Sequence, residues 1–318
     1  MQLKKIIESL PGIHLDRWLT FNLYLKNESK NCLEFYTMKI SVVIPCFNGA
    51  SVIDKQLEAL TQQTVSPYEV IVADNGSTDN SQAIAEQYRD RLPGFKVIDA
   101  AGVKGASHAR NRGAIAVTGD CLAFCDADDV VGKRWMEALD LAFRSHDFLA
   151  CRLDYEKLNH DTTNTAQTND LQNFRTPFYP FAGGCGLAIR KAIHDAVGGF
   201  DESVLYLEDA DYCIRVQMAG YPLVFVPDAV VHYRYAEGKS SLLGTCRANY
   251  RKAHNWGYGL ATLYLRYRNQ GMKLYGLPPR LVLIPLWGLR VLGSGFNPHS
   301  VWRLGWHMGV VEGLLAHP

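Results

Sequence analysis

Short apolar runs alternate with helical patterns from residue 39 to about residue 155, and this alternation limits the fold more than any other feature of the chain. The apolar runs at 40–45 and 121–125 are too short for helices, so they predict buried strands. Between them, the apolar positions of residues 50–61 recur at helical spacing. Strands that alternate with helices build a mostly parallel sheet with helices on both faces. We therefore expect an α/β, Rossmann-like fold.

The remaining segments of this region follow the same rule. Each predicted strand is short and bounded by polar or turn residues, whereas each predicted helix has a longer pattern. Past residue 173 the alternation loosens, although a helix is still expected at 208–218, where Gly220 ends it. The further strands are expected at 69–73, 95–98 and 148–155, and the further helices at 82–91, 107–117, 133–143 and 190–197. Residues 221–235 are expected to be extended, with an interruption at Pro227.

Length and composition exclude several classes of protein. The 318 residues suffice for one large α/β domain with an appendage. With a net charge of +1, the chain lacks the excess of positive charge typical of nucleic-acid-binding proteins, so no nucleic-acid partner is expected. The eight cysteines lack zinc-like spacing and fit reduced, buried packing. The N-terminal region has no continuous apolar core of the secretory type, and these features together favour a cytoplasmic location.

The C-terminal tail is rich in aromatic, basic and apolar residues, and a helix is expected at 242–268. The apolar run at 281–289 is too short to cross roughly 30 Å of hydrocarbon as a helix. Residues 301–315 mix apolar positions with Trp, Arg and His, which suits a helix at a membrane interface. Peripheral membrane contact through 276–318 and packing against the rest of the chain or a second subunit both stay open, as does the oligomeric state.

Three acidic residues follow the predicted strand at 121–125. Asp126 and Asp128 are two residues apart, so in an extended backbone their side chains fall on one side. Doubly wound sheets bind their ligands at the carboxyl ends of the strands. Two convergent carboxylates make a hard oxygen site for Mg²⁺ or Mn²⁺, usually completed by waters and phosphates. The pattern therefore predicts a metal-bound diphosphate, although an Asp-x-Asp segment also occurs in solvated turns.

Four short motifs occur in register with the predicted elements. They are VVIPCFN at 42–48, DNGSTD at 74–79, DADD at 126–129 and ED at 208–209. Each motif is weak by itself, but the four in this order resemble glycosyltransferase family 2, whose members have the GT-A fold. The resemblance covers about residues 39–235 and implies a sheet flanked by helices of that type, followed by a C-terminal helical tail.

The resemblance implies a nucleotide-sugar donor. In the family, the loop after the first strand and the acidic residue after the second hold the base and the ribose. The segment ARNRG at 109–113 is similar to the family's Ala-Arg-Asn-x-Gly segment, which lies along the donor. Small residues such as Gly184 would let backbone N–H groups approach a ligand. The residues expected to bind the donor are Pro45, Asn48, Asp74, Asn111, Arg112, Asp126 and Gly184.

The same resemblance implies the metal ligands and the catalytic residues. Asp126 and Asp128 match the family's metal motif, and His232 stands where relatives often carry a histidine near the metal or the diphosphate. Glu208 and Asp209 look like the family's acidic pair on the acceptor side. Asp209 would be the general base that deprotonates the acceptor hydroxyl, and a single displacement with one base inverts the configuration.

The resemblance also divides the chain into parts. Residues 1–37 precede the first convincing strand and are expected to form an N-terminal extension. The GT-A glycosyltransferase domain is expected at 38–241, with 38–130 as its nucleotide-binding half and 131–241 as its acceptor half. Residues 242–318 form the helical, membrane-associating or partner-binding tail.

Departures from the family pattern narrow the expected activity. The Gln-x-x-Arg-Trp segment of processive polysaccharide synthases does not follow the acidic pair, so one-sugar transfer is expected. The acceptor would be a hydroxyl of a glycan or a lipid-linked glycan, in polysaccharide biosynthesis at the cytoplasmic face of a cell-envelope membrane. Two alternatives stay open, a nucleotidyltransferase and a non-catalytic nucleotide-sugar-binding homologue. Nucleotidyltransferases usually carry a Gly-rich basic loop after the first strand, whereas residues 45–50 hold one glycine and no basic residue.

Overall fold

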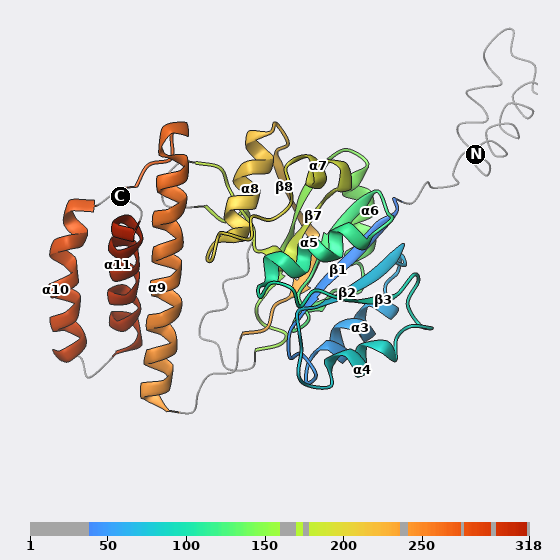
Figure 1. Cartoon of the computed structure of the whole chain (residues 1–318), viewed down its shortest axis with the longest axis horizontal. Helices are drawn as coiled ribbons and strands as arrows, with labels where there is room; N and C mark the ends of the chain where they lie inside the picture. The colour runs from blue at the N-terminus through green and yellow to red at the C-terminus, as the bar shows by residue number, and fades with distance from the viewer. Residues whose placement is uncertain are drawn as a thin grey trace, which may run out of the picture. The chain divides into compact units, whose positions relative to one another are not determined.

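The computed structural model describes residues 38–159, 170–173, 178–235, 241–274, 277–293 and 297–316. The chain separates into two units, Met1–Met38 and Lys39–Pro318. The expected N-terminal extension at 1–37 lies outside the described residues. All described helices and strands belong to the second unit (Figure 1).

An eight-stranded mixed sheet forms the centre of the second unit, in the order β3-β2-β1-β4-β7-β6-β8-β5. Neighbours are parallel from β3 to β4 and between β6 and β8, whereas β7 runs against both of its neighbours and β5 runs against β8. The predicted α/β class is confirmed. The strands are β1 (Ile40–Cys46), β2 (Glu69–Asp74), β3 (Lys96–Asp99), β4 (Cys121–Phe124), β5 (Val130–Val131), β6 (Phe148–Asp154), β7 (Leu187–Arg190) and β8 (Leu223–His232).

Helices flank this sheet, and each predicted helix of the region has a counterpart in the structure. The helix expected at 82–91 is shorter than predicted and ends at Glu86, where turns replace it. Two strands, β5 and β7, were not predicted from the sequence. The helices are α3 (Ile53–Thr61), α4 (Ser81–Glu86), α5 (Ala106–Ala116), α6 (Trp135–Phe143), α7 (Lys191–Ala196) and α8 (Glu208–Met218), with a short 3₁₀ helix η1 (Gly184–Gly186).

The parallel strands β1, β2 and β4 end at one edge of the sheet, which is where such sheets place their ligands. Cys46 at the end of β1 lies opposite Asp74 at the end of β2. Phe124 at the end of β4 lies opposite Val43 of β1. The loops that follow these three strands are therefore neighbours, although 80 residues of sequence separate Cys46 from Asp126.

Helix α5 packs unusually close to β1. Gly113 of α5 faces Val43, and a Cβ atom at position 113 would overlap the Cγ1 atom of that valine. Val43 belongs to a fully buried cluster that also contains Leu122 and Phe124 of β4. The glycine of the ARNRG segment therefore serves close helix–sheet packing, and it fixes α5 against the central strands.

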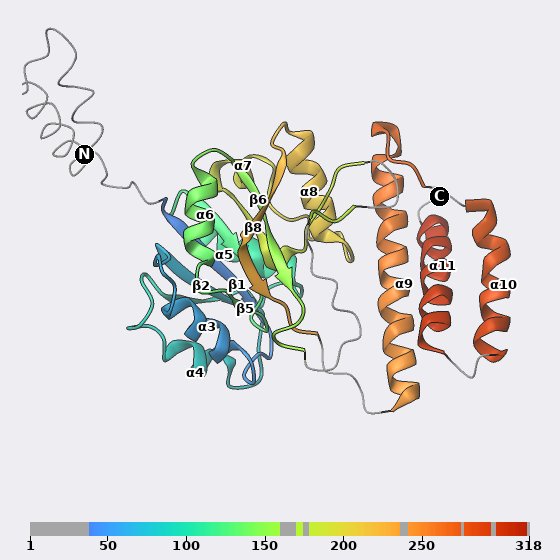
Figure 2. The ribbon, with the colours of Figure 1, turned by 180° about the vertical axis from the view of Figure 1, so that it is seen from behind.

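Three helices form the C-terminal region: α9 (Leu242–Tyr267), α10 (Leu277–Gly293) and α11 (Pro298–Ala316). They lie side by side in both views (Figures 1 and 2). Leu260 and Ala261 of α9 share a buried cluster with Ala210 and Ile214 of α8, so this region packs against the α/β part. Among the described residues, no helix is long and apolar enough to cross a bilayer.

Glycines let α9 and α11 pack at backbone contact. Gly305, Gly309 and Gly313 recur every fourth residue, so they share one face of α11. Cβ atoms at these positions would fall against the backbone carbonyl groups of Tyr250, His254 and Tyr258 in α9. Side chains larger than hydrogen have no space along this seam.

Gly309→Ala is expected to lower the free energy of unfolding by about 1–3 kcal/mol, because its methyl group would overlap the His254 carbonyl group. Gly288→Ala in α10 is the matched control, since nothing lies within 4 Å of its Cβ position. The control should leave stability unchanged or raise it by up to about 1 kcal/mol through helix propensity. Denaturant unfolding followed by circular dichroism measures both. Equal effects of the two substitutions would contradict the close α9–α11 contact.

Candidate active site

Asp74 is the last residue of β2, and only one of its two carboxylate oxygens has hydrogen-bond partners among the described residues. Its Oδ2 atom accepts hydrogen bonds from the N–H groups of Gly76 and Ser77 at 3.2 and 3.0 Å and from Gln82 Nε2 at 2.8 Å. Its Oδ1 atom is buried and has no hydrogen-bond partner within the described part of the chain. A ligand N–H or O–H group could satisfy that oxygen, as the sequence predicts for a base or a ribose.

Asn48 joins the loop after β1 to the loop after β2. Its Oδ1 atom accepts from the Thr78 N–H at 2.8 Å, and its own N–H donates to Ser77 Oγ at 2.9 Å. Its φ of 50° is left-handed, which asparagine tolerates better than most residues. Pro45 lies in β1 opposite Ala73. The structure therefore places both predicted donor-binding residues beside Asp74, with Asn48 shaping the loops.

Arg110 of α5 is the buried cation at the centre of the site. Its Nη2 atom donates to Asp126 Oδ1 at 2.7 Å, and its Nη1 atom lies 3.6 Å from Glu208 Oε1. The guanidinium group also lies over the Phe200 ring, 5.5 Å from the centroid. Burial disfavours the charge, but the Asp126 and Glu208 carboxylates outweigh it and raise the pKa of Arg110. This one side chain joins the acidic turn after β4 to the acidic pair of α8.

Arg112, which is expected to bind the donor, is exposed, whereas Arg110 of the same segment is buried in the site. Asn111, also predicted for the donor, holds the segment before α8. Its Oδ1 atom accepts from the Phe200 N–H at 2.9 Å, and its Nδ2 atom donates to the Phe200 carbonyl and to Glu202 Oε1, both at 2.8 Å. The structure therefore gives Asn111 a positioning role.

Gly184 leaves the space that Arg110 occupies. A Cβ atom at this position would lie 2.8 Å from the Arg110 Cζ atom. The Gly184 N–H also donates to Asp209 Oδ2 at 3.3 Å. At the adjacent Gly183, a Cβ atom would meet only ordinary contacts, the nearest at 3.7 Å. Gly184 therefore lies beside Arg110 and Asp209, and the position of Arg110 leaves no space for a side chain there.

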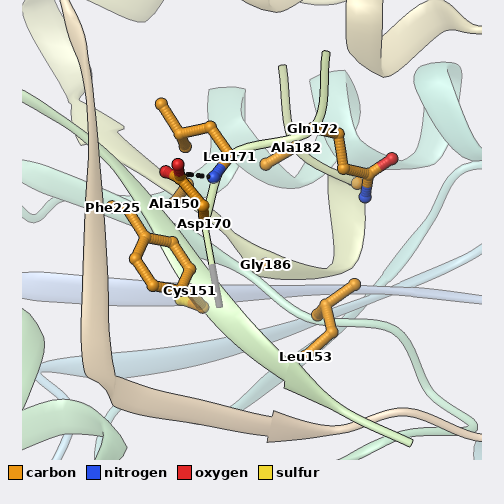
Figure 3. A pocket seen from close by; sticks show the side chains of 10 residues that line it. Ala150, Cys151, Leu153, Asp170, Leu171, Gln172, Ala182, Gly186 and Phe225 are labelled. Atoms are coloured by element: carbon orange, nitrogen blue, oxygen red, sulfur yellow. Dashed lines mark hydrogen bonds between the residues drawn. The ribbon is translucent and has the colours of Figure 1, made fainter. Parts of the chain in front are cut away.

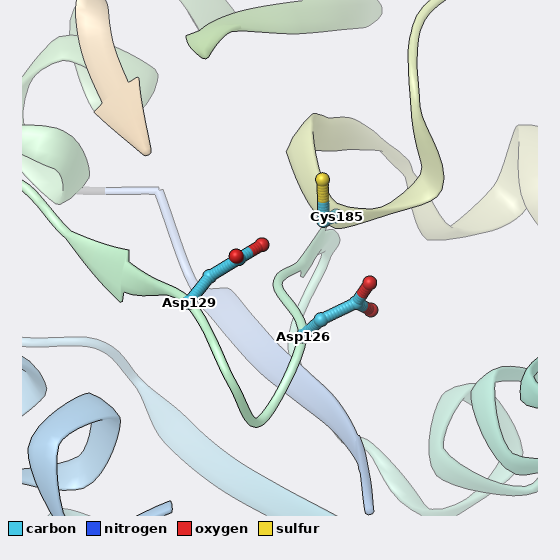
Figure 4. Close-up of side chains that lie close together, drawn as sticks. All are labelled: Asp126, Asp129 and Cys185. Carbon is cyan, nitrogen blue, oxygen red and sulfur yellow. The ribbon is translucent and has the colours of Figure 1, made fainter. Parts of the chain in front are cut away.

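Asp126, Asp129 and Cys185 bring ligand atoms within 4.8 Å of one another (Figure 4). Asp129, the last residue of the DADD motif, is 1% exposed. Its Oδ1 atom accepts from the Arg234 N–H at 2.9 Å, whereas its buried Oδ2 atom has no partner within the described residues. Burial and the neighbouring Asp126 carboxylate raise the pKa of Asp129 to about 8. A cation at this position would relieve both costs.

The two carboxylates fit a hard divalent cation, whereas the Cys185 thiol does not. Burial raises the pKa of Cys185 well above its ordinary value, which keeps the thiol protonated. Asp128, which the sequence predicts as a metal ligand, is exposed, and its carbonyl oxygen accepts from Arg234 Nε at 2.7 Å. Within the described residues, the cluster of possible ligands contains Asp126 and Asp129 but not Asp128.

His232 lies at the end of β8 and has both ring nitrogens engaged. Its Nδ1 atom pairs with the Asp154 carboxylate, and its Nε2 atom lies 3.2 Å from Lys157 Nζ. Burial lowers the pKa of this histidine, with Lys157 acting in the same direction and Asp154 opposing it. The structure therefore does not bring His232 into the cluster of Asp126 and Asp129.

Glu208 and Asp209 begin α8, directly after Leu207, whose φ of 60° is left-handed. This turn aims both carboxylates at the glycine segment and at Arg110. Burial and the Glu208 carboxylate raise the pKa of Asp209, whereas the Gly184 N–H and Arg110 oppose that shift. Asp209 therefore has the environment of a base with an increased proton affinity.

A second buried aspartate anchors α8 from the other side. Asp211 is fully buried, and its Oδ1 atom accepts from Arg266 Nη1 at 2.8 Å and from the Tyr267 hydroxyl at 2.7 Å, both in α9. Its Oδ2 atom accepts from Arg215 Nε at 2.8 Å. Sequence reasoning missed this residue, because its partners in α9 lie 55 and 56 residues away. Helix α9 thus helps to position the helix that carries Asp209.

The glycine segment also borders a small cavity of about 10 Å³ (Figure 3). Cys151, Leu153 and Gly186 are among the residues that line it. This space is at the lower limit for one water molecule, so the cavity is too small for a sugar or a nucleotide.

Comparison with known proteins agrees with this geometry. The profile of Glycosyl transferase family 2 matches residues 41–199, which is half of the chain. The profile of Glycosyl transferase family group 2 matches residues 122–313 and so extends into the C-terminal helices.

Curated relatives are glycosyltransferases. Glycosyltransferase AglE of Haloferax volcanii is 29% identical over 202 residues, which are 60% of this chain and 65% of AglE. The uncharacterized glycosyltransferase YwdF of Bacillus subtilis is 29% identical over 242 residues, which are 71% of this chain and 86% of YwdF. The chain thus spans just under two thirds of the length of AglE.

Two solved structures share the fold. Mannosyltransferase PcManGT from Pyrobaculum calidifontis, in complex with GDP-Man and Mn²⁺, matches this chain with a TM-score of 0.58 at 16% identity. The match covers 93% of this chain and 95% of the PcManGT chain. S. aureus TarS 1–349 in complex with UDP-GlcNAc matches with a TM-score of 0.54 at 18% identity. That match covers 86% of this chain and 91% of the TarS chain. These likenesses show the GT-A fold, and the family match shows that the chain belongs to glycosyltransferase family 2.

Proposed function

We propose that this glycosyltransferase moves one sugar from a nucleotide-sugar donor to a hydroxyl group of a glycan or lipid-linked glycan, with inversion at the anomeric carbon. The observation that carries the proposal is the bridge through Arg110, which lies 2.7 Å from Asp126 and 3.6 Å from Glu208. It brings Asp126, which would hold the divalent cation of the donor diphosphate, and Glu208, the neighbour of the candidate base Asp209, to one guanidinium group.

On the donor side, the unpaired Oδ1 atom of Asp74 would accept from the base or the ribose. Two proteins with the same fold bind nucleotide sugars in their solved structures, GDP-Man in PcManGT and UDP-GlcNAc in TarS, which supports a donor of this class. Pro45 and Asn48 would shape the loop beside it, and Gly184 would keep Arg110 in place. The 38–130 and 131–241 halves would then bind donor and acceptor, respectively.

A divalent cation, Mg²⁺ or Mn²⁺, is part of the proposal. Asp126 would hold it, with Asp128 as the motif predicts or with Asp129, which the buried geometry favours. Such an ion, when bound, supplies positive charge to the departing diphosphate. His232 is left out of the proposed ligand set because Asp154 and Lys157 engage its ring.

On the acceptor side, Asp209 would take the proton of the attacking hydroxyl group. As the oxygen bonds to the anomeric carbon, the bond from that carbon to the diphosphate oxygen breaks, and the nucleoside diphosphate leaves with the electron pair. One displacement with one base inverts the configuration. Glu208 would raise the proton affinity of Asp209 and pair with Arg110.

Asp209→Asn should lower transfer by about 10²–10⁴-fold, because an amide cannot accept the proton. Donor binding should stay nearly intact, because Asp209 does not contact the Asp74 end of the site. Nucleoside diphosphate release measures transfer, and thermal stabilisation by the donor measures binding. Residual turnover with lost donor binding would assign Asp209 to the donor instead.

The pH dependence of kcat/KM tests the environment of Asp209. A base acts only when ionised, so activity should fall as the pH drops through the raised pKa of Asp209, above the pH at which an ordinary aspartate titrates. Glu208→Gln removes the adjacent negative charge and should move this acid limb to lower pH. An acid limb that Glu208→Gln moves to higher pH would contradict the proposed pairing.

Gly184→Ala should lower kcat/KM by about ten- to a hundredfold, because its methyl group would displace the Arg110 guanidinium. Gly183→Ala is the matched control, since its methyl group meets only ordinary contacts. Comparable unfolding temperatures for the two variants would show that the loss is local. Equal activities would count against a placement of Arg110 that depends on Gly184.

The acceptor and the site of action complete the proposal. The expected acceptor is a glycan or lipid-linked glycan, and the expected site is the cytoplasmic face of a membrane, contacted through residues 276–318. The poly(ribitol-phosphate) beta-glucosyltransferase of Bacillus spizizenii, 36% identical over 105 residues that are 17% of its length, acts on a polymer by its name, which supports a polymeric acceptor.

A further inference from the structure

The near-zero net charge of the chain conceals a strong separation of charge. Residues 241–318 contain nine lysines and arginines and a single acidic residue, Glu312. Residues 1–240 contain 24 basic and 31 acidic residues. The C-terminal helices are therefore strongly cationic, whereas the remainder of the chain is anionic. A cationic region of this kind is complementary to an anionic surface.

The outer side of α10 carries exposed leucines. Leu286, Leu289 and Leu292 are 54%, 67% and 71% exposed, and their spacing of three residues places them on one side of the helix. On the opposite side, Val291 is buried with Cys246 and Val301. Helix α10 is thus apolar both where it packs and where it faces outward, which is unusual for a helix that meets only water.

A cation lies beside this leucine stripe. Arg290 is exposed, and its guanidinium carbon lies 5.2 Å from the centre of the Trp287 ring. An apolar face flanked by arginine and tryptophan is typical of helices that lie in the plane of a membrane interface. At 17 residues, α10 is about 25 Å long, so it is too short to span the hydrocarbon core.

We infer that the leucine stripe of α10 (Leu286, Leu289 and Leu292) docks on an anionic lipid surface. The leucines would enter the boundary between headgroups and acyl chains, while Arg290 beside them would meet lipid phosphates. Charge complementarity favours anionic lipid over a neutral protein partner. The inference deepens the proposed membrane contact of residues 276–318 and rests on the proposed function only for that contact.

The full-length chain is tested for co-sedimentation with vesicles of phosphatidylcholine alone and with vesicles in which about a third of the lipid is phosphatidylglycerol. Binding should be at least about tenfold stronger to the anionic vesicles and should weaken as salt is raised. The double variant Leu286→Glu/Leu289→Glu should lose at least about tenfold of this binding. Leu141→Glu in α6, at a leucine that is 51% exposed, is the matched control and should bind as the unchanged chain does.

Donor hydrolysis without lipid is measured on the same variants, so failure of the proposed enzyme and failure of the docking surface are separate results. Unchanged hydrolysis and unchanged unfolding temperature in the double variant would show that only docking is lost. Equal binding to both vesicle types, or full binding by the double variant, would overturn the inference. Displacement of the chain from anionic vesicles by polyphosphate, with retained polyphosphate binding in the double variant, would instead identify the cationic region as a site for an anionic polymer.

Discussion

A buried guanidinium group holds the candidate active site together. Arg110 is 4% exposed, and a charge so far from water needs opposite charges close to it. It finds them in Asp126, from the turn after β4, and in Glu208, from the start of α8. The two halves of the site, more than 80 residues apart in the sequence, are therefore held at a fixed separation by one side chain.

Small residues make this arrangement possible. Gly113 brings α5 against Val43 of β1, so Arg110 starts from a helix seated close to the sheet, and Gly184 leaves room for the guanidinium group where it arrives. Asn111 and Arg215 hold the segment before α8, through Phe200 and through the carbonyl groups of Val197 and Gly199. The ARNRG segment thus contributes close packing through Gly113, positive charge through Arg110 and positioning of the segment before α8 through Asn111.

Local pattern was sufficient to predict most of the fold. Strands such as β1 and β2 are buried along their whole length, and a continuous apolar run predicts them without knowledge of their neighbours. β5 has only two residues and exists because Val130 and Val131 pair with the distant end of β8, so no local signal marks it. The prediction for Asp126 and the acidic pair of α8 rested instead on the resemblance of the four ordered motifs to the family.

The rest of the site depends on contacts that sequence spacing does not reveal. Arg110 and Arg112 are two residues apart on one helix, and only the packing of α5 on β1 decides which of them is buried. His232 and Asn111 make hydrogen bonds with residues 78 and 89 positions away, and no local pattern predicts these contacts. The same is true of Asp211, whose role follows from α9.

The pH profile of kcat/KM for Arg110→Gln, with Arg110→Lys as the charge-retaining control, tests the central claim most directly. Loss of the cation should weaken metal-dependent donor binding through Asp126 and should also move the acid limb to higher pH, because Arg110 opposes the raised pKa of Asp209. The lysine variant should keep more of both properties. If Arg110→Gln changed donor binding and left the acid limb in place, the two halves of the site would be independent, and the account given for Arg110 would be wrong.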